Sequence, residues 1–285
     1  MPPLLLWLKL SRPGLWFPCL WLYLLPLQGL LPRAETPDFW LGLLYVSFPL
    51  NFWVYGWNDM VDKETDRCNP RKDSYLFGAR ATDDQLHALP KVMGSVQLLF
   101  WPLLVWRGGI AMAGIFLAIA LFLWAYNHPS RGLRGRPPWE LCCQVGYQLV
   151  VLLSCVLNDA SLPRLEVWLY LSLFCVQSQL IGEVMDIQPD RQAGRKTTAV
   201  VLGIGRTKGL IGLVVFVECI MMLVVFKDWV FGTGLCAFLF WLVLDGLVLF
   251  KRREYTVFEM KLFGIGGNLA ALASIIYVQW SGVLS

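Results

Sequence analysis

The stretch richest in residues that could do chemistry is NDMVDKETD, which follows a long apolar run. Asp59, Asp62 and Asp66 stand at positions i, i+3 and i+7, so they share one face of a helix, with Asn58 one turn before Asp62. Three like charges on one stripe repel one another, whereas a bound divalent cation would reverse that effect. Ligands that offer only oxygen suit Mg²⁺, which binds through a few carboxylates together with substrate phosphates.

A second acidic cluster repeats this spacing in GEVMDIQPDRQAGRKTTAV, where Glu183, Asp186 and Asp190 again stand at i, i+3 and i+7. Because Pro189 opposes a regular helix, we expect Asp190 to lie just past a helix end. Cations follow both clusters: Arg67, Arg71 and Lys72 after the first, and Arg191, Arg195 and Lys196 after the second. Carboxylates that hold Mg²⁺ within a ring of Lys and Arg would make a suitable diphosphate site. A solvated loop with local salt bridges would explain one cluster better than it explains two.

The remainder of the chain has the composition of a membrane protein. Of its 285 residues, 57% are hydrophobic and 15% are charged. Because about 20 apolar residues cross a bilayer as a helix, we predict an all-α polytopic membrane protein with about nine transmembrane helices. The apolar N-terminus lacks a basic start and a small-residue cleavage site, so we expect it to be kept as the first helix. The predicted spans are 14–32, 38–57, 92–108, 110–127, 141–158, 165–183, 209–226, 229–250 and 262–281.

The positive charges predict the orientation. Only Arg33, Arg107, Arg164 and Lys227 lie in the odd-numbered connections, and the other 20 of the 24 Lys and Arg residues lie on the opposite side. The positive-inside rule therefore places the N-terminus and the acidic clusters in the cytoplasm or its equivalent, in a bacterial inner membrane or an organelle. We read these cations as topology signals rather than as a surface for nucleic acid.

The two motifs resemble those of the UbiA superfamily of intramembrane prenyltransferases. NDMVDKETD matches the family pattern NDxxDxxxD, and DIQPD with the following RQAGRKTTAVVLG is similar to its DxxxD motif and trailing G-x-x-T segment. The resemblance begins at Arg12-Pro13 and covers most of the chain. It implies one domain over 1–285, a nine-helix bundle around a central apolar cavity, and an enzyme that ionises an isoprenyl diphosphate bound through Mg²⁺. The prenyl group would pass to a hydrophobic acceptor in the bilayer, such as an aromatic or quinone precursor or another lipid.

The resemblance also assigns roles to individual residues. It implies that one Mg²⁺ is held by Asn58, Asp59, Asp62 and Asp66, and the other by Asp186 and Asp190. Contacts to the diphosphate are expected from Arg71, Lys72, Arg195 and Lys196. In YNHPSRGLRGRP, Tyr126 and Arg134 stand where the family often has Tyr and Lys, so we include both among the substrate-binding residues.

Two carboxylates, Glu218 and Asp245, fall inside predicted spans, where an ionisable residue is a functional candidate. Asp245 is our candidate for the base that removes the final proton, beside the catalytic aspartates at 59, 62, 186 and 190. It could equally be a neutral residue that is hydrogen-bonded to a neighbouring helix.

Three other functions compete with simple transfer to an aromatic or lipid acceptor. One is a carotenoid chain elongase, because DRCNPRKD and DRQAGRKTTAVVLG look similar to segments of that branch. Another is a membrane terpene cyclase, which ionises the same diphosphate and needs no external acceptor. A transporter is disfavoured, because transporter sites lie near the membrane midplane and these charges lie at helix ends.

Overall fold

The structure is a computed structural model that describes residues 3–28 and 33–284 of the chain. Helices form nearly all of the regular structure, and these described residues contain no strand. Ser74 and Gly78 form one isolated bridge. The prediction of an all-α fold is therefore confirmed.

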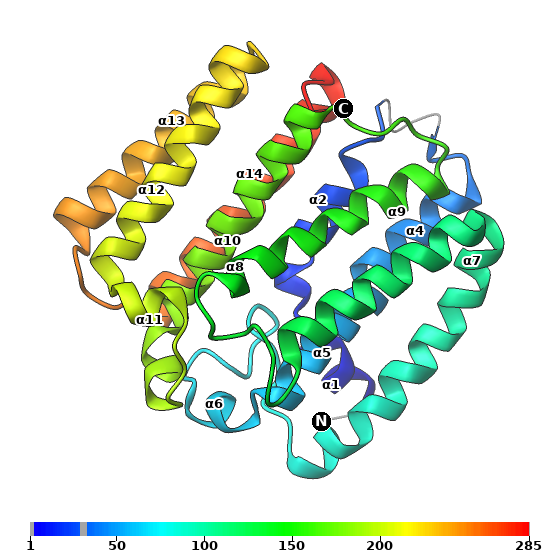
Figure 1. Cartoon of the computed structure of the whole chain (residues 1–285), viewed down its shortest axis with the longest axis horizontal. Coiled ribbons are helices and arrows are strands. Elements are labelled where there is room, and N and C mark those ends of the chain that lie inside the picture. Colours follow the sequence, from blue (N-terminus) through cyan, green and yellow to red (C-terminus); the bar gives the residue numbers. More distant parts are fainter. Residues whose placement is uncertain (1–2, 29–32, 285) are drawn as a thin grey trace.

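The helices run through the chain in a bundle that Figure 1 shows along its shortest axis. In chain order they are α1 (Pro3–Leu10), α2 (Phe17–Leu24), α4 (Pro37–Ser47), α5 (Pro49–Val61), α6 (Lys63–Cys68), α7 (Asp83–Asn127), α8 (Trp139–Gln144), α9 (Leu149–Leu157), α10 (Leu165–Gln192), α11 (Thr198–Leu202), α12 (Ile204–Ile220), α13 (Trp229–Leu244) and α14 (Val257–Ser281). Two of them continue into short π-helical turns, α12 into Met221–Val225 and α13 into Asp245–Leu249.

Six helices among the described residues are long and apolar enough to cross a membrane. They are Asp83–Asn127, Trp139–Leu157, Leu165–Gln192, Ile204–Val225, Trp229–Leu249 and Val257–Ser281. The chain is thus an integral membrane protein, but the structure does not confirm the predicted count of nine spans.

The first two predicted spans appear as shorter helices, and a proline explains the division of the second. The predicted span 14–32 contains α2, and its last residues, 29–32, lie outside the described part of the chain. The predicted span 38–57 is divided into α4 and α5 at Pro49, the first residue of α5. A proline has no backbone N–H to continue a helix, so an apolar run alone does not guarantee one long helix.

Gly109 separates the two halves of α7. Its backbone lies at φ 63° and ψ −155°, inside an otherwise continuous helix. This conformation is open to glycine and strained for other residues. The chain reverses direction at this point (Figure 1), which agrees with the prediction of separate helices at 92–108 and 110–127.

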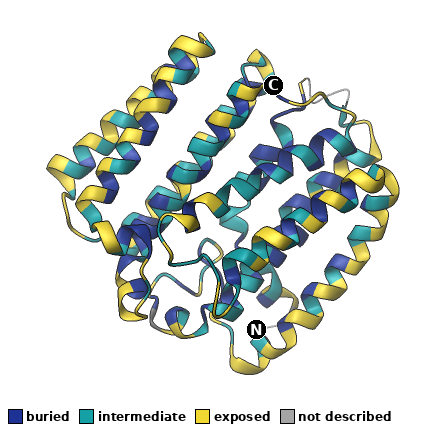
Figure 2. Cartoon of the chain, viewed as in Figure 1, coloured by how far each residue is buried: buried dark blue, intermediate teal, exposed yellow. Residues whose placement is uncertain are grey.

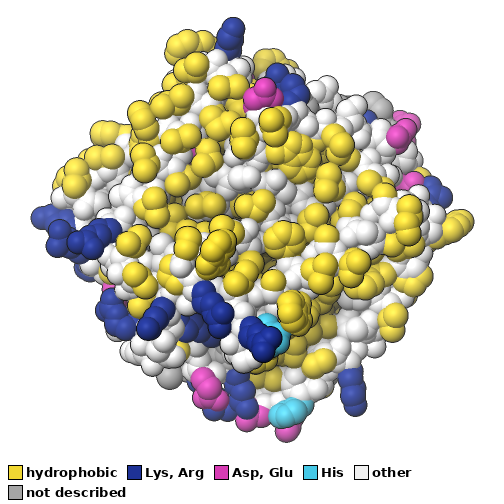
Figure 3. All heavy atoms as spheres, in the orientation of Figure 1, with side chains coloured by type: hydrophobic (Ala, Val, Ile, Leu, Met, Phe, Trp, Pro, Cys, Tyr) yellow, Lys and Arg dark blue, Asp and Glu magenta, His cyan; other side chains and the backbone are white. Residues whose placement is uncertain are grey.

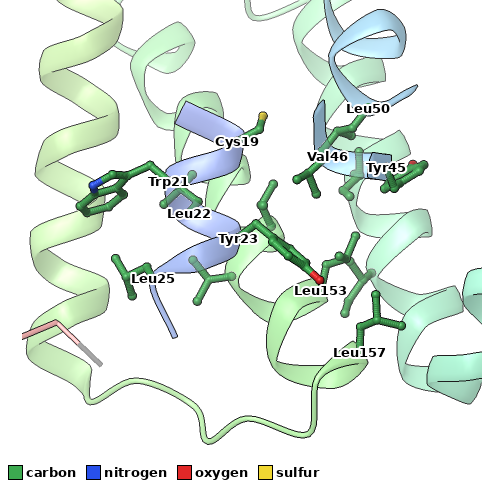
Figure 4. Packing of buried hydrophobic residues seen from close by; sticks show 14 of the residues in the cluster. Cys19, Trp21, Leu22, Tyr23, Leu25, Tyr45, Val46, Leu50, Leu153 and Leu157 are labelled. Atoms are coloured by element: carbon green, nitrogen blue, oxygen red, sulfur yellow. The ribbon is translucent and has the colours of Figure 1, made fainter. Parts of the chain in front are cut away.

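The largest buried cluster joins α2, α4, α5, α7 and α9 (Figure 4). Tyr23 lies in its centre, fully buried, and its hydroxyl donates a hydrogen bond to the carbonyl of Phe39 at 2.9 Å. The same oxygen accepts a bond from the Asn158 side chain at 2.9 Å, so the buried polar group is satisfied. This packing fixes α5, which carries the first acidic motif.

The outer surface is apolar around the bundle. Figure 2 shows exposed residues along α12 and α13, and the exposed apolar side chains include Phe240 of α13 and Trp280 of α14. Figure 3 shows a broad apolar face with most of the visible Lys and Arg side chains gathered along its lower edge. A belt of exposed apolar side chains suits contact with lipid.

The cavities at the charged end are small. One, of about 20 Å³, is lined by residues that include Asp59, Asp66 and Arg80. The other, of about 40 Å³, is lined by residues that include Asn69 and Tyr255. Each has room for roughly one or two water molecules. The structure therefore does not confirm the expected central apolar cavity.

Replacing Gly109 by alanine tests the break in α7. No atom lies within 4 Å of the added Cβ, so only backbone strain opposes the change. We expect Gly109→Ala to lower the free energy of unfolding by about 1–3 kcal/mol. Thermal unfolding of the purified protein in detergent measures it.

Gly114→Ala is the matched control, because its added Cβ also meets no atom within 4 Å and its backbone is helical. This variant should be neutral or slightly more stable. Equal melting temperatures for the two variants would show that Gly109 carries no special backbone requirement.

Candidate diphosphate and metal site

The first acidic motif spans the junction of α5 and α6. Asp62 stands between the two helices, yet its N–H still bonds to the carbonyl of Asn58 at 2.9 Å. The N–H of Asp66 bonds to the carbonyl of Asp62 at 2.8 Å. Helical hydrogen bonding therefore continues through the motif, and the aspartates keep the spacing of one helix face.

Asp59 is buried between two cations. Its Oδ1 accepts from Arg12 Nη2 at 2.5 Å and from Lys72 Nζ at 2.8 Å. Lys72 also pairs with Asp66 at 2.6 Å. The Arg12 guanidinium lies 4.5 Å from the centre of the Tyr55 ring, a favourable cation–π distance. A lysine and an arginine from distant segments thus offset the repulsion between two motif carboxylates.

Arg195 joins the two acidic motifs. Its guanidinium donates to Asp62 of the first motif and to Asp190 of the second, the latter at 3.3 Å. Arg134 contacts the other oxygen of Asp62. The sequence motifs, more than a hundred residues apart, therefore meet around shared cations.

Asp186 is held by the segment that follows the first motif. Arg71 donates to its Oδ2, and the Asn69 side chain donates to its Oδ1 at 3.0 Å. The backbone carbonyl of Asn69 in turn accepts from Arg80 at 2.9 Å. This loop, between α6 and α7, thus connects the two motifs a second time.

The expectation that Asp190 lies past the end of its helix is wrong. Helix α10 continues through Pro189 to Gln192, and Asp190 is buried within its last turn. The N–H of Arg195 bonds to the carbonyl of Asp190 at 2.9 Å. This bond and the ion pair hold the last turn from outside the helix, so the proline does not end it.

Burial and like charge make this an electrostatically strained site. Burial raises the pKa of Asp66 to about 6, opposed by Lys72 and assisted by the charge of Asp59. Burial lowers the pKa of Arg195 to about 10. For Arg12, burial disfavours the charge, but the neighbouring Asp59 and Asp66 raise its pKa overall. These groups are stable as ions only while they remain together.

The oxygen atoms of the first motif suit a hard metal ion. Asn58 Oδ1 and Asp59 Oδ2, on adjacent residues, are both buried without a hydrogen-bond partner. Cations separate the carboxylates, and within residues 3–28 and 33–284 no three His, Cys, Asp or Glu residues are grouped ready to hold a metal. A donor set of carboxylate and amide oxygens fits Mg²⁺ once the cations move aside.

The remaining predicted residues lie in different surroundings. Tyr126 accepts a bond from Gln179 at 3.4 Å, and the Arg134 guanidinium lies 5.7 Å from its ring centre. Lys196 is exposed in the loop beside Arg195.

Asp245 has partners of its own. It pairs with Lys208 at 2.7 Å and accepts from the Tyr255 hydroxyl at 2.8 Å, while its Oδ1 has no hydrogen-bond partner. Glu218 is fully buried in α12, and neither of its oxygens has a partner.

Sequence reasoning missed two residues that contact the motifs, Arg12 and Asn69. Arg12 counts as a topology signal and as the first residue of the family resemblance, but nothing in its surrounding sequence marks a partner 47 residues away. Asn69 is an ordinary polar residue in NPRKD, and no local pattern distinguishes its contact with Asp186.

Comparison with known proteins places this chain. The model of the UbiA prenyltransferase family matches residues 15–276. The lycopene elongase/hydratase of Corynebacterium glutamicum is 26% identical over 84% of this chain and 86% of its own length. That of Haloarcula japonica is 27% identical over 85% and 79%. The structure of a UbiA homolog from Archaeoglobus fulgidus bound to DMAPP and Mg²⁺ has the same fold, with a TM-score of 0.67 at 17% identity over 97% of this chain and 99% of that one.

The fold and the family model together define the class as a membrane-embedded enzyme that transfers prenyl groups. The chain belongs to the UbiA prenyltransferase family.

The Arg12–Asp59 pair can be tested by its contribution to stability. Replacing Arg12 by leucine leaves the buried Asp59 with Lys72 alone, and we expect a loss of about 3 kcal/mol. Adding Asp59→Asn to Arg12→Leu should restore part of that loss, because the uncompensated charge disappears. Unfolding of the single and double variants in detergent measures the coupling.

Arg67→Leu is the control, because Arg67 forms its ion pairs at the exposed surface and should leave the melting temperature nearly unchanged. Purely additive losses in the double variant would contradict a direct interaction between Arg12 and Asp59.

Proposed function

We propose that the protein is a Mg²⁺-dependent prenyltransferase that ionises an isoprenyl diphosphate within the membrane and transfers the prenyl group to a hydrophobic acceptor. One observation carries the proposal: Arg195 contacts Asp62 of one motif and Asp190 of the other. Two sets of carboxylates and a set of cations therefore share one end of an apolar bundle. This combination meets the needs of a substrate with a charged diphosphate and an apolar tail.

The motif residues divide between metal and diphosphate. One Mg²⁺ would be held by Asn58, Asp59, Asp62 and Asp66, and the other by Asp186 and Asp190. When bound, Mg²⁺ supplies positive charge to the leaving diphosphate. The cations expected to contact the diphosphate oxygens are Arg71, Lys72, Arg134, Arg195 and Lys196. Arg12, which contacts Asp59, is a further candidate.

The chemistry follows from breaking the allylic C–O bond, whose electron pair leaves with the diphosphate. A double bond of the acceptor then supplies the electrons of the new C–C bond, and a base takes the proton that is lost. The apolar bundle keeps water from the cation. The Tyr55 ring, which already faces the Arg12 guanidinium, can also face a carbocation. Asp245 is the candidate base, with one oxygen free of hydrogen bonds.

A carotenoid end group is the acceptor that the comparisons favour over an aromatic or quinone precursor. The relatives from C. glutamicum and H. japonica are lycopene elongase/hydratases, and they match this chain over most of its length. An acyclic polyene is also a hydrophobic molecule that the bilayer can deliver. Cyclisation of the donor without an acceptor remains the second candidate.

The site is proposed to face the cytoplasm or its equivalent. Arg107 pairs with Asp38, and Arg33 donates to the carbonyl of Asn158, near the turn of α7 and the end of α9. Figure 1 places these elements at the end of the bundle opposite α6 and α11. This separation of Arg33 and Arg107 from the acidic end of the bundle supports the predicted 20-to-4 distribution of Lys and Arg. It thereby supports the proposed positive-inside orientation.

Metal and carboxylate removal test the reaction. We expect release of diphosphate from a labelled allylic substrate to stop when EDTA removes Mg²⁺ and to return when Mg²⁺ is restored.

Asp59→Ala and Asp186→Ala should each lower turnover by at least about 100-fold. Asp84→Ala, at an exposed aspartate in the first turn of α7, is the control and should keep normal turnover. Near-normal turnover in either site variant would remove that residue from the proposed metal site.

The acceptor is tested with the wild-type protein. Incubation with Mg²⁺, labelled allylic diphosphates of several lengths and lycopene should give a labelled carotenoid that is longer than lycopene. The Asp59→Ala variant serves as the blank. Labelled hydrocarbon formed without lycopene would favour the cyclase, and product formed only with aromatic acceptors would overturn the elongase assignment.

A further inference from the structure

Glu140 is a buried carboxylate that the proposed chemistry does not use. It lies in the first turn of α8 with no exposed surface. Its Oε1 accepts two hydrogen bonds from Thr198, one from the backbone N–H at 2.8 Å and one from the hydroxyl at 2.6 Å. A buried carboxylate is costly unless such bonds compensate it, so this contact between two short helices requires a reason.

A second buried carboxylate reaches the same place. Glu183 Oε2 accepts from the N–H of Ala199 at 3.1 Å, and its Oε1 accepts from Gln179 at 3.1 Å. The next N–H, of Val200, donates to the Thr197 hydroxyl at 3.4 Å. The first backbone N–H groups of a helix have no partner within it, and here each has one from outside. Because α11 has only five residues, it depends on such anchors.

The anchored helix end directly follows the loop that carries Arg195. Five residues, 193–197, connect α10 to α11, and Gly194 turns the chain at φ 70°. Arg195 is three residues before Thr198, and its guanidinium contacts Asp62 and Asp190. Fixing Thr198 therefore restricts where Arg195 can lie.

Glu140 also stands six residues after Arg134, the other arginine that contacts Asp62. The Glu140–Thr198 contact thus fastens together the two connections that supply arginines to the same carboxylate. We propose that Glu140 is a positioning residue: it holds the start of α11 against α8 and so sets Arg134 and Arg195 at the diphosphate site. This inference rests on the proposed function.

Kinetics separates positioning from mere support of the fold. Glu140→Leu removes the acceptor and should raise KM for the allylic diphosphate about tenfold, with KM for the acceptor unchanged. Glu140→Gln keeps an acceptor oxygen for Thr198 and should keep KM near the wild-type value. If Glu140→Leu does not fold, Glu140→Asp takes its place, because its shorter side chain cannot reach Thr198. Glu35→Ala, at an exposed glutamate, is the control.

Two results would overturn the inference. One is a fall in kcat alone in Glu140→Leu with both KM values unchanged, which indicates only less folded enzyme. The other is a Glu140→Gln variant as defective as Glu140→Leu, which excludes the hydrogen-bond acceptor as the cause.

If the wild-type protein consumes no prenyl diphosphate, the proposed function is wrong. Two further measurements still test the positioning role of Glu140 in that case. Hydrogen exchange should be faster at the amides of Thr198 and Ala199 in Glu140→Leu but not in Glu140→Gln. Binding of inorganic pyrophosphate with Mg²⁺, measured by calorimetry, should weaken about tenfold in the leucine variant only. Unchanged exchange and unchanged pyrophosphate affinity would refute the positioning role.

Discussion

The mutual compensation of buried charges at one end of an apolar bundle is the constraint on which the rest of the structure depends. An uncompensated carboxylate in poorly solvated surroundings costs several kcal/mol, even after relaxation. Each aspartate of the two motifs is met by at least one Arg or Lys, and Asp59 and Asp62 are each met by two. Such pairs seldom make a protein more stable than apolar residues would. Their presence is therefore better explained by a ligand than by stability.

The partners of these aspartates come from separate connecting segments, so the charges also organise the end of the bundle. Arg12 precedes α2, Arg71 precedes α7, Arg134 follows α7 and Arg195 follows α10. The apolar core around Tyr23 fixes the helices, and the ion pairs then draw the connections together over the motifs. Without the connections, α5 and α10 would carry opposed negative stripes with nothing between them.

The features that could be predicted from the sequence are those that depend on interactions between residues close together in the chain. Helical periodicity is local, so the spacing of Asp59, Asp62 and Asp66 was sufficient to place them on one face. Likewise, the spans predicted at 92–108 and 110–127 divide at Gly109, where α7 breaks. The continuation of α10 past Pro189 was missed because bonds from outside the helix outweigh a local rule.

Longer-range contacts had no local sign. Arg12 looks like any cation near a membrane span, and Glu140 looks like any carboxylate near a loop, because their partners lie 47 and 58 residues away. Hydropathy located the apolar runs but did not reveal that Pro49 divides one of them into two helices. The family resemblance supplied residue roles that physical patterns alone left open.

The ion pairs also bear on how the proposed ligands would enter. Under the proposed function, a diphosphate would compete with the carboxylates for Arg195, and Mg²⁺ would compete with Arg195 for Asp62 and Asp190. Either ligand alone would leave a buried charge without a partner, whereas the two together would exchange one set of opposite-charge pairs for another. Donor and metal binding are then coupled in free energy, each favouring the other. The positions of Arg134 and Arg195 matter for this reason: the same guanidinium groups must reach Asp62 before the exchange and a diphosphate oxygen after it, and a loose loop would meet neither requirement.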